Sequence, residues 1–284
     1  MLRYKGTMDL YTKVSIACSK ITTHKYSTSF SLGIRSLDTK FHDPVYSIYG
    51  FVRFADEIVD TFNRDDAAEL LEEFKRDTFL AIRRGISLNP ILNSFQHVVN
   101  TYKIEDELIE TFLHSMEMDL SDREYDQQTF ETYILGSAEV VGLMCLRVFC
   151  EGNDAQYQEL KKPAMCLGSA FQKINFLRDI KNDYLTLGRV YFPNLNIKEF
   201  DSSSKKAIEA DILSDFNAGL AGIKALPKGA RLGVYIAYVY YLNLLKKITQ
   251  TSPSEILEKR IRVRNSYKYF LIIRSYLQHS FNSI

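Results

Sequence analysis

Two stretches of the sequence place carboxylates at the spacing of successive helical turns. The first, YGFVRFADEIVD at residues 49–60, contains Arg53, Asp56 and Asp60. The second, QKINFLRDIKNDYLTLGRVYFP at residues 172–193, repeats the arrangement over a longer distance. Its polar residues are spaced 3, 4 and 4 positions apart, so on a helix they form one stripe: Gln172, Asn175, Asp179 and Asp183.

Carboxylates arranged in this way suit the binding of divalent cations. Two carboxylates one turn apart can share hard cations, and Mg²⁺ prefers oxygen ligands while it keeps waters and substrate phosphates in its shell. Asn175 adds a neutral oxygen, and the guanidinium groups of Arg53 and Arg178 can neutralise phosphate oxygens. The stripes therefore predict a magnesium site for a polyphosphate ligand.

Each stripe is apolar or small toward its N-terminal end and acidic toward its C-terminal end. Tyr49 and Val52 precede the first pair of acids, and Met165 and Gly168 precede the second. An apolar groove that ends in acids, metal and arginines suits an amphiphile with a hydrocarbon tail and a diphosphate head, such as an isoprenoid diphosphate. Metal-assisted departure of diphosphate would leave an allylic carbocation, which needs a dry site and can be stabilised by aromatic π faces.

The alternative is that both stripes are solvated faces of surface helices. A single DxxxD pattern is more often a solvated acidic turn, and only its repetition favours a functional pair. The residues alone leave the two interpretations open.

Two helices are expected to carry the stripes. Asp43 followed by Pro44 is a good N-terminal signal, so the first helix is expected to begin there. The second is expected to run from Pro163 to about Leu187, with Gly188 placed to end it. Its opposite side would pack into the bundle through Leu167, Ala170, Ile174 and Leu177.

The composition fits one all-α domain over residues 1–284. Most segments show a 3.6-residue periodicity, and no series of alternating strand patterns occurs. Lys+Arg is 36 against Asp+Glu 35, so the chain has no overall basic field that would indicate a nucleic-acid partner. The segment from Lys246 onward is basic, with eight Lys or Arg and two acids, which fits an anion partner or, more commonly, a solvated basic helix.

The cysteines and the apolar runs bear on cellular location. The four cysteines show no CxxC spacing and are expected to be reduced core residues: Cys18, Cys145, Cys150 and Cys166. No signal peptide opens the chain, and the longest apolar run, at 233–245, is 13 residues, too short to span a bilayer. We therefore expect a cytoplasmic protein, soluble or peripheral at the membrane. Its oligomeric state is not indicated.

The two acidic motifs also resemble those of a known family. RxxDxxxD at 53–60 and QxxNxxRDxxxD at 172–183 resemble the motifs of the squalene and phytoene synthases, the head-to-head isoprenoid synthases. Upstream, YSTSF resembles the family's HSxSF, and MEMDL at 116–120 and VVGLM at 140–144 are also similar to family segments. The resemblance extends along most of the chain.

This resemblance implies the isoprenoid-synthase fold, a single helical bundle in which the two acidic stripes face each other across a central cavity. It implies that Mg²⁺ is held by Asp56, Asp60, Asn175, Asp179 and Asp183. It implies substrate-binding roles for Ser27, Arg53, Gln172, Asn175, Arg178 and Arg260. The catalytic residues would be the four aspartates together with Phe30 and Tyr241, which would line the carbocation site.

The implied reaction is the condensation of two geranylgeranyl diphosphates, through prephytoene diphosphate, to the C40 carotenoid precursor phytoene. Two alternatives stay open: squalene or dehydrosqualene formation from two farnesyl diphosphates, and a non-catalytic relative that binds a lipid or a protein partner. Tyr26, Thr28, Leu135 and Glu139 depart from the family pattern, which leaves open the pocket details and the group that takes the final proton. Peripheral contact with a membrane for product release is a further expectation.

Overall fold

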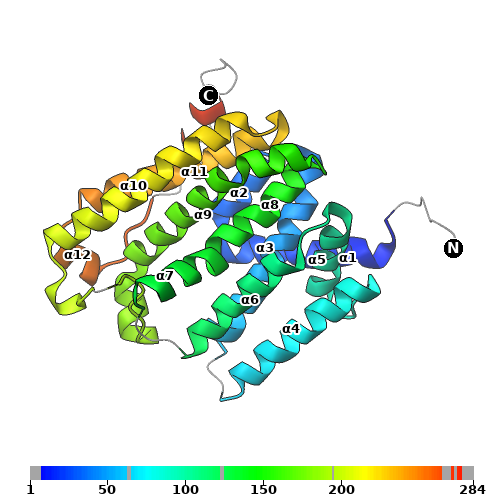
Figure 1. The fold of residues 1–284 in the computed structure, drawn as a ribbon, viewed down its shortest axis with the longest axis horizontal. Coiled ribbons are helices and arrows are strands. Elements are labelled where there is room, and N and C mark those ends of the chain that lie inside the picture. Colours follow the sequence, from blue (N-terminus) through cyan, green and yellow to red (C-terminus); the bar gives the residue numbers. More distant parts are fainter. Residues whose placement is uncertain are drawn as a thin grey trace.

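Every regular element of the computed structural model is helical, as the sequence predicts (Figure 1). The structure describes residues 8–62, 65–121, 125–193, 195–263, 270–271 and 274–276, and these contain no β-strand. The α-helices are α1 (Leu10–Tyr26), α2 (Thr28–Arg35), α3 (Thr39–Asp60), α4 (Ala67–Arg84), α5 (Pro90–Tyr102), α6 (Asp106–Ser121), α7 (Gln127–Ile134), α8 (Val140–Cys150), α9 (Asp154–Asn182), α10 (Ser202–Ala225), α11 (Lys228–Thr249) and α12 (Pro253–Glu258). Three short turns join them: the π-helical η1 (Leu135–Glu139) and η2 (Asp183–Leu187), and the 3₁₀ turn η3 (Ile197–Glu199).

Helix α9 is the longest helix and lies in the middle of the bundle, between α10 and α11 on one side and α8 on the other (Figure 1). Helix α3 packs against α1, α5 and α8. The two helices that carry the acidic stripes therefore belong to the interior of the bundle rather than to its surface.

Two clusters of buried side chains form the core, and aromatic rings stack at the centre of each. In the first, Phe51 of α3 stacks on Phe95 of α5 with 3.8 Å between ring centroids. In the second, Phe176 of α9 stacks on Tyr191, which follows η2, at 4.0 Å. The second stack fixes the loop after α9 against the helix that carries the second acidic stripe.

Helix α3 begins five residues before the position predicted from Asp43 and Pro44, at Thr39. Pro44 therefore lies inside the helix, where its missing N–H costs one backbone hydrogen bond. The extra turn is stabilised by packing, because Phe41 is buried and meets Phe149 edge to face at 5.4 Å. The prediction was wrong because burial of one aromatic ring outweighed the local proline signal.

Helix α9 likewise begins earlier than predicted, at Asp154 instead of Pro163, because Asn153 caps it and Tyr157 is buried in its first turns. Pro163 lies inside the helix and packs directly against Gly222 of α10. Any larger residue at position 222 would clash, because its Cβ would lie 2.4 Å from the Cβ of Pro163. The predicted C-terminal end is confirmed. Gly188 is the C-cap of η2 and has a positive φ of 67°, a conformation that favours glycine.

One helical stretch in the described part of the chain, 127–150, is long and apolar enough to cross a membrane by length and composition alone. It comprises α7, η1 and α8, not the 233–245 run that stands out in the sequence. Of its most apolar window 56% is buried inside the bundle, a pattern that a central core helix also produces. All four cysteines are free, as predicted, although only Cys150 is fully buried.

Candidate active site

The first acidic stripe occupies the last turns of α3. Arg53 Nη1 lies 3.5 Å from Asp56 Oδ2, and the guanidinium also forms an ion pair with Glu57. The ring of Tyr26, which stands where the family pattern has histidine, lies beneath this guanidinium at 4.3 Å from its centroid. The Nε of Arg53 is buried and has no hydrogen-bond partner among the described residues. Arg53 is thus held in place by Asp56, Glu57 and the ring of Tyr26.

The second acidic stripe occupies the last turns of α9 and η2. Asp179 receives two arginines: Arg178 Nη2 lies 2.5 Å from Oδ2, and Arg260 Nε lies 2.6 Å from Oδ1. Arg260 comes from the segment after α12, so residues far apart in the sequence meet at this carboxylate. One turn before Asp179, the Tyr241 hydroxyl donates to Asn175 Oδ1 at 3.3 Å.

The two stripes come close together in the fold, because Arg189, six residues after Asp183, forms an ion pair with Asp60 of the first stripe. Burial raises the pKa of Asp183 to about 7, and the charges of Asp179 and Asp60 act in the same direction. Burial likewise raises the pKa of Asp56 to about 7, with Arg53 opposing and Asp60 adding to the rise. The site therefore contains more negative charge than it can solvate, and an incoming cation would relieve this.

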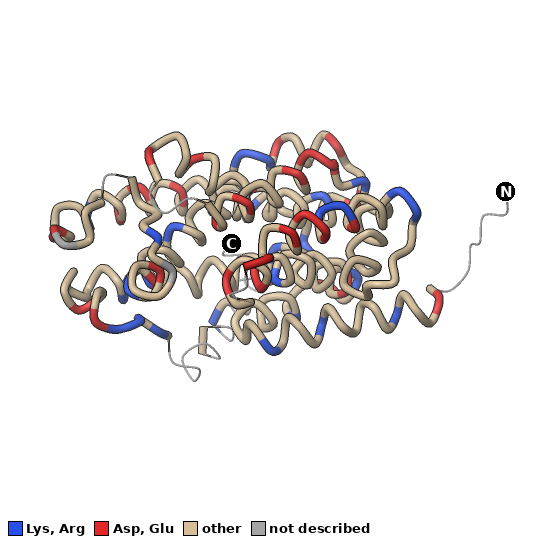
Figure 2. The backbone as a smooth tube through the Cα atoms, turned by 90° about the horizontal axis from the view of Figure 1, so that it is seen from below, with Lys and Arg blue, Asp and Glu red and all other residues tan. Residues whose placement is uncertain are grey.

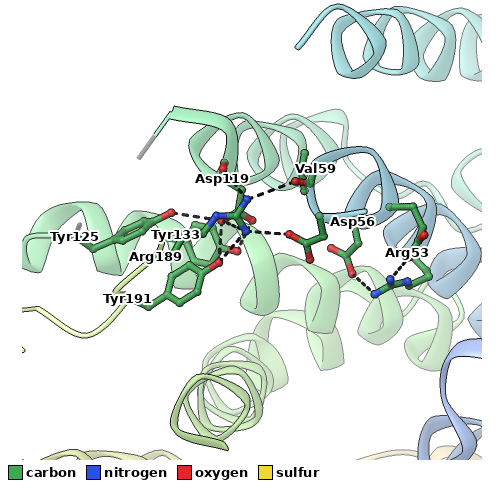
Figure 3. Close-up of polar contacts among 10 residues, drawn as sticks. Arg53, Asp56, Val59, Asp119, Tyr125, Tyr133, Arg189 and Tyr191 are labelled. Atoms are coloured by element: carbon green, nitrogen blue, oxygen red, sulfur yellow. Dashed lines mark hydrogen bonds and ion pairs between the residues drawn. The ribbon is translucent and has the colours of Figure 1, made fainter. Parts of the chain in front are cut away.

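Arg189 joins the first stripe to the interior of the bundle (Figure 3). Its Nη1 lies 2.9 Å from Asp60 Oδ1, and its Nη2 donates to the backbone carbonyl of Asp119 at 2.7 Å. Burial by itself would lower the pKa of Arg189, but Asp119 and the other groups around it raise that pKa above its ordinary value. Arg189 follows Gly188 directly. The turn at Gly188 therefore directs the Arg189 side chain toward Asp60 of the first stripe.

Asp119 of α6 is a fifth carboxylate of the site, which the sequence did not single out. It is 4% exposed and accepts hydrogen bonds from the hydroxyls of Tyr133 at 2.6 Å and Tyr191 at 3.0 Å (Figure 3). Burial raises its pKa to about 6, although Arg189 opposes the rise. The available signal was the segment MEMDL, but it contains two acids, Glu117 and Asp119, and only the fold places Asp119 next to Arg189 and Asp60.

An apolar cavity of about 270 Å³ ends at the polar part of α9. Its walls come from α2, α3, η1, α8, α9, α10 and α11, and most of the lining side chains are hydrophobic. The predicted residues that line it are Ser27, Phe30, Gln172, Asn175 and Tyr241. The ring of Tyr241 stacks on Phe171 at 4.1 Å, so the wall near Asn175 presents aromatic faces. The four predicted aspartates lie further along α3, α9 and η2 and are not part of the cavity wall.

A second, polar cleft of about 410 Å³ lies on the other side of Asp179. Four cationic side chains line it: Arg178, Lys181, Arg260 and Arg262. This is where the basic C-terminal segment meets the second stripe. Of that segment's predicted cations, Arg264 and Lys268 lie outside the described residues.

The carboxylates fit a divalent cation by chemistry, although arginines currently neutralise them. No group of three His, Cys, Asp or Glu side chains is close enough to coordinate a metal ion in the part of the chain that the structure describes. Asp56, Asp60 and Asp179 are each paired with an arginine instead. The donor set is nevertheless entirely oxygen, which suits Mg²⁺.

Two departures from the family pattern lie at η1, away from the acidic stripes. Leu135 packs against the first core cluster. Burial and the charge of Asp215 raise the pKa of Glu139 to about 7, while Lys173 lowers it. Glu139 therefore belongs to a charge cluster between α9 and α10, not to the candidate site.

The helical architecture is similar to that of solved squalene and dehydrosqualene synthases. A dehydrosqualene synthase in complex with a ligand superposes with a TM-score of 0.81 at 19% identity, covering 96% of this chain and 98% of that one. The squalene synthase HpnC from Alicyclobacillus acidocaldarius gives 0.74 at 18% identity, covering 86% and 96%. These likenesses establish the isoprenoid-synthase fold.

The sequence comparison places the chain within that class. The model of the family described as squalene/phytoene synthase matches residues 23–267, and the chain belongs to this family.

Relatives with several activities are similar to the chain. A presqualene diphosphate synthase of Rhodopseudomonas palustris is 30% identical over 174 residues, which are 59% of this chain and 58% of that protein. A phytoene synthase of Cereibacter sphaeroides is 24% identical over 84% of this chain and 73% of that protein. A 4,4'-diapophytoene synthase of Staphylococcus haemolyticus is 27% identical over 67% and 66%. The names of these relatives therefore refer to different products.

Proposed function

We propose that this protein is a Mg²⁺-dependent phytoene synthase, which joins two geranylgeranyl diphosphates head to head. Family membership indicates an enzyme of the prenyltransferase type. The observation that supports the proposal is an apolar cavity lined at one end by Gln172, Asn175 and Tyr241, with Asp179 and Asp183 one and two turns further along α9 and η2. A hydrocarbon tail fits the cavity, and a diphosphate head would then lie among the acids and arginines.

The proposed cation site consists of Asp56, Asp60, Asn175, Asp179 and Asp183. When bound there, Mg²⁺ would assist the departure of diphosphate by neutralising its charge. Arg53, Arg178 and Arg260 would bind phosphate oxygens, and their present pairing with carboxylates keeps them within reach. Each half-reaction would release one diphosphate and one proton, so that two C20 diphosphates give one C40 hydrocarbon.

The remaining site residues would bind and shield the hydrocarbon. Phe30 and Tyr241 line the cavity, where aromatic faces can stabilise an allylic cation while apolar walls exclude water. Tyr241 is oriented by two contacts, its stacking on Phe171 and its hydrogen bond to Asn175. Ser27 caps α2 through the N–H of Phe30, which ties the position of that ring to the helix start.

A second candidate is an enzyme that acts on two farnesyl diphosphates. The 30% identity to a presqualene diphosphate synthase and the fold match to a dehydrosqualene synthase support it. Such an enzyme would give presqualene diphosphate, squalene or dehydrosqualene. A non-catalytic relative is a third candidate, although the presence of both acidic motifs favours an enzyme.

The test is product identification with purified protein, Mg²⁺ and either geranylgeranyl or farnesyl diphosphate, with and without NADPH. We expect a C40 hydrocarbon from geranylgeranyl diphosphate, unchanged in rate and mass by NADPH. A C30 product from farnesyl diphosphate with no C40 product would overturn the chain length. A product reduced only when NADPH is present would assign the enzyme to the squalene class, and no turnover of either substrate would favour the non-catalytic relative.

A further inference from the structure

Helix α1 buries its polar side and exposes its apolar side, the reverse of an ordinary surface helix. The side that packs against α3 and α5 carries mainly small polar residues: Thr12, Ser15, Ser19 and Thr23, with Ile16. The side that faces solvent carries an apolar stripe of Leu10, Val14, Ala17 and Ile21. At about 100° per residue these four lie within roughly 60° of one another.

The polar side of α1 is fully accommodated by hydrogen bonds inside the protein. Ser19 Oγ lies 2.7 Å from Ser94 Oγ, and Asn93 Nδ2 donates to Ser15 Oγ at 3.0 Å. Thr23 Oγ1 donates to the backbone carbonyl of Ser19 at 2.8 Å. These hydrogen bonds fix the rotation of α1 about its own axis. Turning the apolar stripe inward would break them, so the stripe faces solvent.

The turn between α4 and α5 extends the apolar stripe. Ile86 is exposed, and Leu88 is 95% exposed, the most exposed large hydrophobic side chain in the described part of the protein. The Tyr11 hydroxyl donates to the backbone carbonyl of Ser87 at 2.7 Å, which holds this turn beside the N-terminal end of α1. Together, the exposed side chains form one surface, here called the α1 face: Leu10, Tyr11, Val14, Ile21, Ile86 and Leu88.

Basic residues border the α1 face. Helix α1 contains no acidic residue, and Lys13 and Lys20 flank the stripe on one side while Lys25 flanks it on the other. Figure 2 shows α1 along an outer edge of the molecule, next to the N-terminal end, with blue segments along the helix and one red segment at its start, where Asp9 is the N-cap. Two further exposed cations, Arg83 and Arg84, precede the turn that carries Leu88. An apolar stripe with a cationic border is the pattern of a helix that lies in the interface of an anionic membrane.

We infer that the α1 face binds the surface of an anionic lipid bilayer, with α1 lying in the plane of the headgroups. A second copy of this chain is the competing occupant. In a two-fold dimer through this face, Lys13, Lys20 and Lys25 of one protomer would approach the same lysines of the other, and α1 offers only one acid, its N-cap Asp9, against these three cations. Charge therefore favours the bilayer.

The inference adds a location to the proposed function and would explain how an insoluble product leaves. Helix α1 leads directly into Ser27, which lines the apolar cavity, so the membrane-binding helix and the cavity are joined by one residue. Vesicle binding needs no turnover, however. The membrane inference and the proposed reaction can therefore fail independently of each other.

The test is cosedimentation of the full chain with vesicles, in which phosphatidylglycerol mixed with phosphatidylcholine is compared with phosphatidylcholine alone. We expect binding to the anionic vesicles that weakens with added salt. Leu10→Glu and Leu88→Glu are each expected to reduce the partition coefficient by at least about tenfold, because each removes an inserted side chain and adds a repelled charge. Leu213→Glu on α10 is the matched control, an exposed helical leucine outside the α1 face, and is expected to bind like the unaltered protein.

A second pair of changes separates the two contributions. Lys13→Gln combined with Lys20→Gln is expected to reduce the preference for phosphatidylglycerol while the thermal unfolding temperature stays the same. The inference is overturned if the unaltered protein does not sediment with anionic vesicles, or if Leu10→Glu binds as well as Leu213→Glu. It is also overturned if Leu10→Glu converts a dimer to a monomer in analytical ultracentrifugation, since a second copy would then be the occupant.

Discussion

Replacing Arg189 by methionine should destabilise the fold in a pH-dependent way. The guanidinium is 4% exposed and neutralises Asp119, also 4% exposed, at 3.4 Å and Asp60 at 2.9 Å. Its loss leaves Asp119 as a buried carboxylate without a cation, which typically costs about 3 to 5 kcal/mol when one partner of a buried pair is removed. We expect a loss of that size in the free energy of unfolding at pH 8, measured by urea denaturation in EDTA.

The direction of the pH dependence follows from Asp119. Its pKa in the folded protein, about 6, is above the ordinary value of 3.8, so the stability that this group contributes is fully present below the ordinary pKa. That stability is lost as the pH rises through the folded pKa. Without Arg189 the pKa rises further, and each added unit costs about 1.4 kcal/mol at pH values above it. The destabilisation should therefore be smaller at pH 5.5 than at pH 8.

Two variants control this experiment. Arg189→Lys keeps the charge and should lose less stability than Arg189→Met. Arg76→Gln removes an arginine that is 64% exposed and paired with Asp77 at the surface, and should change the free energy by no more than about 0.5 kcal/mol. A loss below about 1 kcal/mol for Arg189→Met at pH 8, or an equal loss at both pH values, would refute the assignment of Arg189 as the counter-ion of Asp119.

The other predictions concern the carboxylate stripes. Asp56→Asn or Asp179→Asn should lower the rate of diphosphate release by at least about a thousandfold while the circular dichroism spectrum stays unchanged, because each removes a charge for metal binding and no packing group; near-normal turnover would contradict the site. EDTA should stop the reaction and Mg²⁺ should restore it, and full activity in the chelator would count against a metal. Because Asp56 and Asp183 have a pKa raised to about 7, their contribution to stability is present at low pH and is lost as the pH rises through 7. Added Mg²⁺ should therefore raise the unfolding temperature more at pH 8 than at pH 6, and a larger effect at pH 6 would show that the raised carboxylates do not bind it.

Helical spacing was enough to predict the two stripes, because Asp56, Asp60, Asp179 and Asp183 are related by local geometry alone. The fold class and the family, inferred from the motifs, are confirmed. The contacts of Arg189 with Asp60 and of Arg260 with Asp179 join residues 129 and 81 positions apart, so no local pattern encodes them.

Tertiary packing explains why the sequence did not reveal the partners of Asp119 or the starts of α3 and α9. Asp119 lies six residues from the nearest tyrosine in the sequence, and it acquires Tyr133 and Tyr191 as partners only when α6 meets α7 and the loop after η2. The starts of α3 and α9 were misplaced because Phe41 and Tyr157 are buried by neighbouring helices, which extended each helix beyond its proline. The walls of the apolar cavity come from seven elements, so no single motif specifies its shape.

The most direct test of the proposed function is the ratio of diphosphate released to hydrocarbon formed in one incubation with geranylgeranyl diphosphate and Mg²⁺, without NADPH. Head-to-head condensation predicts two diphosphates for each C40 hydrocarbon. One diphosphate for each C20 product would mean that the acidic stripes ionise a single substrate and that no condensation takes place, which would contradict the proposal.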